Sequence, residues 1–98
     1  MAKLLFEWDE NKNKVNIKKH KVSFEEAKTV FYDENALVTQ DPEHSEEEDR
    51  FIIIGFSSIT RILLVCFCER NQGKVIRIIS ARKPTKTEAN QFSRRLRR

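Results

Sequence analysis

The stretch VIRIISARKPTKTE, residues 75–88, decides the fold because it joins the last predicted strand to the last predicted helix. Its first half alternates like a buried strand, yet it carries Arg77 in its middle and Arg82 at its exit. The spacing from Thr85 to Glu88 is that of a capping box, which predicts that a helix begins there. The pattern therefore places two guanidinium groups on or beside a sheet.

Upstream of this stretch the sequence predicts two helices and four more strands. The first helix begins after an Asp9 cap and ends near His20, and a capping box at Ser23 begins the second. The predicted strands are 4–8, 36–40, 50–57, 61–69 and 74–81. Because the last three have short connections, we expect an antiparallel meander. The predicted fold class is α+β, an antiparallel sheet with helices packed on one face, in the order β-α-α-β-β-β-β-α.

Large apolar side chains recur on the predicted helices at the spacing of one face. We expect Phe24, Phe31 and Phe92 of these helices in the core, with Ala89 and Leu96 beside Phe92 toward the sheet. Trp8, at the end of the first predicted strand, is expected in the core as well. The 98 residues predict a single domain, 1–98, with a basic C-terminal tail. The chain has neither a run of about 20 apolar residues nor a signal peptide, so a cytoplasmic location without membrane contact is expected by default.

The charge distribution is more informative than the net charge of +4. The segment 82–98 contains seven Lys or Arg residues and one Glu, whereas 41–49 contains six acidic residues and no basic one. The basic end is suited to collecting phosphates, and the acidic loop to screening that site or meeting a basic partner. Two solvated faces without further function are the alternative.

The two cysteines and two histidines do not form a pattern typical of a metal site. Cys66 and Cys68 lie on the same face of a predicted strand, a geometry that disfavours a disulfide between them. His20 and His44 have no ligand-type spacing to this pair. We therefore expect neither a metal nor a cofactor.

Four segments, in order, resemble the BrnT family of bacterial type II toxins: FEWDENK (6–12), KHKVSFEEA (19–27), DPEHSEEEDR (41–50) and IRIISARKPTKTE (76–88). The resemblance implies a small ribonuclease with a RelE-like fold that arrests growth. It also implies a cognate DNA-binding antitoxin of the ribbon-helix-helix type, encoded nearby, and leaves open a homo-oligomer within the toxin–antitoxin complex.

The sequence departs from the family pattern at three positions. Lys21 replaces a usual Gly, so the first helix should end with some backbone strain or in a different way. Glu10 replaces a usual Pro, and Pro84 a usual Ala; both changes are compatible with the fold.

Metal-free RNA cleavage requires a base for the 2′-hydroxyl, positive charge for the phosphorane and an acid for the leaving oxygen. Arg77 and Arg82 are our leading candidates for a phosphate clamp, because guanidinium groups present a planar fork of donors to phosphate. Glu69 is expected to orient one arginine or to act as general base, and His20 or His44 to act as acid or base.

The geometry of this constellation depends on two details of the last strands. Arg77 and Arg82 are an odd number of residues apart, so they converge only if Arg82 has left the strand or a bulge intervenes. A three-residue loop (71–73) would pair Glu69 with Val75 beside Arg77, whereas a four-residue loop (71–74) would pair it with Ile76. We favour the three-residue loop.

The remaining basic residues are candidates for RNA contacts. Lys83, Lys86, Arg94 and Arg95 are expected to bind RNA phosphates. Arg50 and Arg61 begin neighbouring strands and are secondary candidates. The rival function, from a different class, is a non-catalytic module that binds nucleic acid or a partner protein and modulates the partner's DNA binding.

Overall fold

The structure is a computed structural model that describes residues 4–44, 46 and 49–96. Its helices are α1 (Glu10–His20), α2 (Phe24–Thr29) and α3 (Lys86–Leu96), and short 3₁₀ turns occupy Val30–Tyr32 and Pro42–His44. Its strands are β1 (Leu5–Glu7), β2 (Leu37–Gln40), β3 (Arg50–Phe56), β4 (Ile62–Arg70) and β5 (Val75–Arg82). The predicted order of helices and strands is confirmed. Within the described ranges, no helix is both long and apolar enough to cross a membrane.

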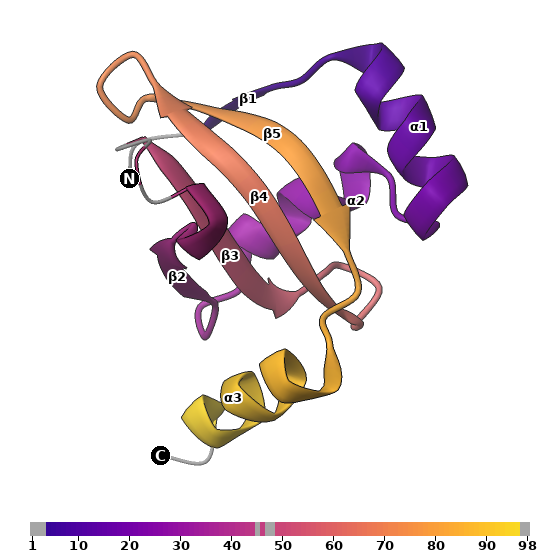
Figure 1. The fold of residues 1–98 in the computed structure, drawn as a ribbon, viewed down its shortest axis with the longest axis vertical. Coiled ribbons are helices and arrows are strands. Elements are labelled where there is room, and N and C mark those ends of the chain that lie inside the picture. Colours follow the sequence, from indigo (N-terminus) through magenta and orange to yellow (C-terminus); the bar gives the residue numbers. More distant parts are fainter. Residues whose placement is uncertain (1–3, 45, 47–48, 97–98) are drawn as a thin grey trace.

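The five strands form one mixed sheet in the order β1-β5-β4-β3-β2 (Figure 1). Strands β2 to β5 pair antiparallel, whereas β1 pairs parallel with β5. The prediction of a fully antiparallel sheet is therefore wrong for β1. Short connections dictate antiparallel pairing only for the strands that they join, and β1 is separated from β5 by most of the chain.

The helices lie on both faces of the sheet, and not on one as predicted. The main core lies on the α2 face, where Phe24 and Ala27 pack with β-strand residues such as Val65 and Phe67. Phe92 of α3 is fully buried and contacts Phe56, on the opposite face. Leu96 is exposed at 38%, so of the α3 residues that were predicted to pack toward the sheet only Phe92 is fully buried.

A bulge in β5 brings its two arginines to the same face. Cys66 pairs with Ser80 while the next residue, Phe67, pairs with Ile78, which leaves Ile79 as the extra residue. Cys68 then pairs with Arg77 and Leu64 with Arg82. The face opposite the main core is therefore shared by Cys68, Leu64, Arg77 and Arg82. For the two arginines to converge, either a bulge or the departure of Arg82 from the strand was required, and the structure has the bulge.

The prediction for Glu69 is wrong, because Glu69 pairs with Ile76 and Arg70 with Val75. The connection is the four-residue loop 71–74, in which Asn71, Gln72 and Gly73 all adopt positive φ. With this register and the bulge, Glu69 belongs to the face that Phe67 occupies, away from both arginines.

Helix α1 is attached to the sheet through polar side chains. The buried Asn16 donates to the carbonyls of Val22 and Ala81, both at 2.8 Å, and its Oδ1 accepts from the amide of Ala81 at 3.1 Å. Asn16 thus supplies hydrogen-bond partners to the backbone of Ala81, in the part of β5 that the short strand β1 does not reach. Lys21 ends the helix in the left-handed region, at φ 60°, so of the two expected outcomes the structure shows the strained helix end.

Candidate active site

A hollow of about 350 Å³ lies on the sheet face opposite α2. Its walls come from α1, the Pro42–His44 turn, strands β3, β4 and β5, and the first turn of α3. Its basic and imidazole groups are Lys19, His20, His44, Arg50 and Arg82. The fold therefore collects several potential proton-transfer and phosphate-binding groups in one place.

Asp41 organises one wall of the hollow. It is only 4% exposed, and its Oδ2 lies 3.1 Å from His44 Nδ1 and 3.8 Å from Arg50 Nε. Its Oδ1 accepts from the amide of Glu43 at 3.0 Å, and its carbonyl accepts from the amide of His44 at 3.1 Å. A carboxylate at Nδ1 fixes the orientation of an imidazole and directs Nε2 away from the carboxylate.

The opposite wall is formed by a bidentate ion pair between Arg82 and Glu88. Arg82 Nη1 donates to Glu88 Oε1 at 2.8 Å, and Nη2 donates to Oε2 at 3.1 Å. Glu88 also closes the predicted capping box, accepting from the Thr85 amide at 2.7 Å. The hydrogen bonds from Arg82 lower the pKa of Glu88 to about 2, and those to Glu88 raise the pKa of Arg82. The pair therefore fixes the Arg82 side chain at the start of α3.

The floor of the hollow includes Cys66 and Ser80, which pair across β4 and β5. Burial raises the pKa of the Cys66 thiol above its ordinary value. Because a thiol acts as a nucleophile through its thiolate, the position disfavours nucleophilic chemistry by Cys66.

Of the candidate catalytic residues, the structure brings four together: Arg82, His20, His44 and Arg50. Arg77 shares their face but is absent from the hollow's walls, and its Nη1 donates to Glu7 Oε2 at 2.9 Å. Glu69 lies on the other face. Arg61 forms an ion pair with Glu26 and donates to the Lys21 carbonyl at 2.9 Å, contacts that join strand β4 to α2.

The residues predicted to bind RNA phosphates are all exposed. Lys83 precedes α3 and Lys86 is its first residue, so both lie near Arg82 in the sequence. Arg94 and Arg95, near the end of α3, lie outside this hollow and line another one with Leu37 and Gln91. Arg97 and Arg98 of the basic tail lie outside the described residues, as do positions 45, 47 and 48 of the acidic loop.

Three residues that line the hollow were not predicted from the sequence as site residues. Lys19 was one basic residue among many on α1, and only the position of the helix end reveals its side of the sheet. Asp41 lay within a run of carboxylates, although an Asp before Pro is a typical turn residue and was a usable signal. Glu88 was recognised only as a cap, and its second role depends on the bulge that turns Arg82 toward it.

The structure is thus that of a small α+β protein whose mixed five-stranded sheet carries a hollow lined by imidazole and guanidinium groups. The sequence model of a family described as ribonuclease toxin, BrnT, of type II toxin-antitoxin system matches residues 8–88. The chain therefore belongs to the BrnT family of ribonuclease toxins, and family membership implies a cognate antitoxin as partner.

A solved structure supports the same fold. The chain is similar to the ribonuclease toxin BrnT of Brucella abortus, with a TM-score of 0.66 and 24% sequence identity. The match covers 86% of this chain and 100% of the Brucella chain. A search of curated proteins found no match to the sequence.

Proposed function

We propose that the chain is a metal-independent endoribonuclease whose active site is the hollow around Arg82 and His44. The observation that carries this proposal is the grouping of two histidines with Lys19, Arg50 and Arg82 around one space. Acid, base and charge-stabilising groups are the parts that RNA cleavage by an internal hydroxyl requires.

In the proposed reaction, one imidazole accepts the proton of the 2′-hydroxyl and the 2′-oxygen attacks the adjacent phosphorus. The bond from phosphorus to the 5′-oxygen then breaks, and the other imidazole donates the proton that the 5′-oxygen receives. The products are a 2′,3′-cyclic phosphate and a 5′-hydroxyl end. We assign the base to His44, because Asp41 holds its Nδ1 at 3.1 Å, and the acid to His20 on the α1 wall.

The cationic groups would stabilise the phosphorane. Arg82 and Arg50 supply the planar donors that suit phosphate oxygens, and Lys19 adds a point charge. In this assignment Arg50 takes the place that sequence reasoning gave to Arg77. Glu69 receives no role in proton transfer because its register puts it on the other face.

We further propose that the toxin arrests growth by acting in the cytoplasm, and that a ribbon-helix-helix antitoxin silences it by covering the hollow. Support for the toxin assignment comes from the family, whose members are described as ribonuclease toxins of type II toxin-antitoxin systems.

The direct test is incubation of the purified chain with RNA in the presence of EDTA, followed by analysis of the product ends. Cleavage with 2′,3′-cyclic phosphate ends is the expected outcome. Cleavage that occurs only with an added divalent cation, or 3′-hydroxyl ends, would contradict the proposed reaction.

A further inference from the structure

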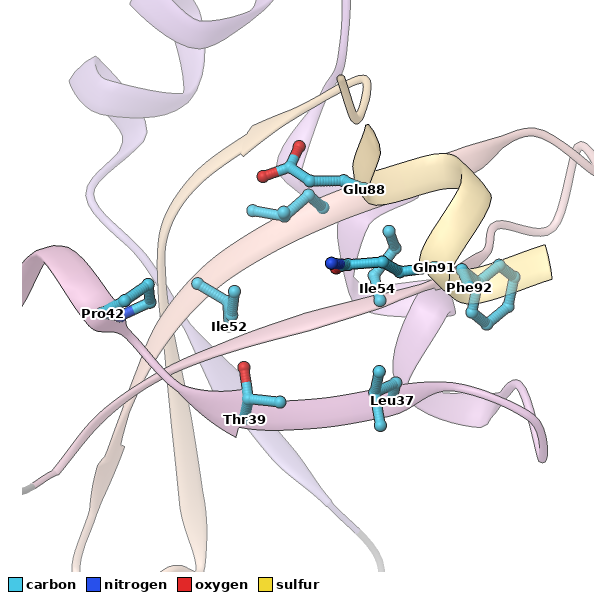
Figure 2. Close-up of a pocket in the computed structure, with 9 residues that line it drawn as sticks. Leu37, Thr39, Pro42, Ile52, Ile54, Glu88, Gln91 and Phe92 are labelled. Carbon is cyan, nitrogen blue, oxygen red and sulfur yellow. The ribbon is translucent and has the colours of Figure 1, made fainter. Parts of the chain in front are cut away.

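A second hollow of about 240 Å³ adjoins the proposed active site, between α3 and strands β2, β3 and β4 (Figure 2). Its apolar walls are formed by Leu37, Ile52, Ile54, Leu64 and the ring of Phe92. We call this space the α3 groove. Its volume is below the range of about 300–1,000 Å³ typical of pockets for drug-sized ligands, so it suits a smaller group.

Two polar side chains enter the α3 groove from opposite walls. Figure 2 shows the Thr39 hydroxyl on β2 and the Gln91 amide on α3 directed toward the space above Ile52 and Ile54. Neither side chain makes a hydrogen bond to another residue within the described part of the chain. Together they present hydroxyl, amide N–H and carbonyl groups, a set that matches the edge of a nucleobase.

The α3 groove is continuous with the proposed active site. Pro42, Ile52, Leu64 and Glu88 line both hollows, and Glu88 is the residue that holds Arg82 at 2.8 Å. A phosphate bound by Arg82 would therefore have the base of its own nucleotide at the mouth of the groove. Farther along α3, Arg94 and Arg95 lie beside Leu37 and Gln91, where a following phosphate would pass.

We propose that the α3 groove binds the nucleobase of a nucleotide adjacent to the scissile phosphate, and that Gln91 and Thr39 read its edge. The inference rests on the proposed ribonuclease function and adds its base specificity. A base matches both features of the groove: its faces pack against the apolar walls, and its edge pairs with an amide.

The test uses purified wild-type protein and the variants Gln91→Leu, Gln91→Glu and Thr39→Val. Each cleaves a pool of RNA with random sequence, and sequencing of the new ends gives the base preference around the cut. Asn90→Leu is the matched control, because Asn90 is an exposed amide on the same helix that does not line the groove.

We expect the wild-type protein to prefer particular bases at one position beside the cut. Gln91→Leu should weaken that preference about tenfold, Gln91→Glu should shift it to a different base, and Asn90→Leu should leave it unchanged. The total cleavage rate on the pool should change far less than the preference.

Wild-type cleavage whose preference survives all three groove substitutions would overturn the inference while leaving the ribonuclease function intact. The same result, combined with a loss of affinity for the antitoxin in Gln91→Leu alone, would assign the groove to the protein partner instead. A wild-type chain that cuts no RNA would overturn the proposed function, and this inference with it.

Discussion

At the scale of single residues, Asp41 and His44 are the pair on which proton transfer depends in our account. The carboxylate of Asp41 is buried, and it contacts both His44 and Arg50. In our proposal Asp41 is therefore a positioning residue for two groups of the site.

The first prediction concerns His44. His44→Gln should lower the cleavage rate by about 10²–10⁴-fold and remove one limb of the pH–rate profile, because a glutamine cannot exchange a proton. Asp41→Asn should lower the rate less and keep both limbs, since the imidazole remains. Pre-steady-state cleavage of a short RNA across the pH range measures both effects. A His44→Gln profile with both limbs at full height would remove His44 from catalysis.

At the scale of elements, the position of α1 relative to β5 determines the distance between His20 and Arg82. Asn16 makes this connection through its three hydrogen bonds to Val22 and Ala81. The apolar residues of α1 do not make it, because Val15 and Ile17 are exposed at 64% and 41%.

The second prediction is that Asn16→Ala destabilises the fold by at least about 2 kcal/mol, because it leaves buried backbone groups without partners. The exposed Asn11→Ala, on the same helix, is the control and should cost far less. Urea denaturation followed by circular dichroism gives both free energies of unfolding. Equal stabilities of the two variants would show that α1 is held by other contacts.

The third prediction concerns the Arg82–Glu88 pair and acid. The pKa of Glu88 is about 2 in the folded chain against 4.5 for a free side chain, so its charge stabilises the fold above about pH 4.5. This contribution falls as the pH drops toward 2, where Glu88 becomes protonated. The stabilisation is modest because both side chains are partly exposed to solvent.

Denaturation of the wild-type protein and Glu88→Gln at pH 6 and near pH 2.5 measures this effect. The wild-type protein should be the more stable at pH 6, and the difference should shrink strongly in acid. Glu26, whose pKa is also lowered, chiefly by hydrogen bonds from Arg61, is present in both proteins and cancels in the comparison. A difference that is independent of pH would contradict the assigned pKa of Glu88.

At the scale of the whole molecule, basic groups lie along one continuous face, from Lys19 on α1 through Arg82 to Arg94 and Arg95 on α3. The active-site hollow and the α3 groove share residues, and the hollow beside Arg94 and Arg95 shares Leu37 and Gln91 with the α3 groove. We expect an extended RNA strand to follow this path, with its phosphates beside the Lys and Arg side chains.

The fourth prediction follows from this path. RNA affinity should fall with salt, and the double variant Arg94→Gln, Arg95→Gln should reduce the slope of log affinity against log salt by about 1.4, because each phosphate contact on a single strand contributes about 0.7. Lys28→Gln, on the α2 side, should leave the slope unchanged. Fluorescence anisotropy with a labelled RNA gives the slopes, and identical slopes would place the end of α3 outside the RNA footprint.

Much of the fold was predictable from local patterns. The capping residues Asp9 and Ser23 and the box from Thr85 to Glu88 begin the three helices as predicted, because capping depends on neighbours in sequence. The parallel pairing of β1, the bulge at Ile79 and the register of Glu69 were not predictable, because each depends on contacts between distant segments. These same features determine which candidate residues meet, so the site was predicted less completely than the fold.

The central claim is that the hollow around Arg82 is a ribonuclease active site, and one comparison of three proteins tests it most directly. Cleavage rates on one RNA are measured in EDTA for the wild-type chain, Arg82→Ala and Arg77→Ala, with thermal unfolding as the check on folding. Arg77 shares the strand and face of Arg82 but pairs with Glu7 outside the hollow. We predict a loss of at least about a hundredfold for Arg82→Ala and nearly wild-type cleavage for Arg77→Ala, with all three proteins folded. A folded Arg82→Ala variant that cleaves RNA as fast as the wild-type chain would contradict the account.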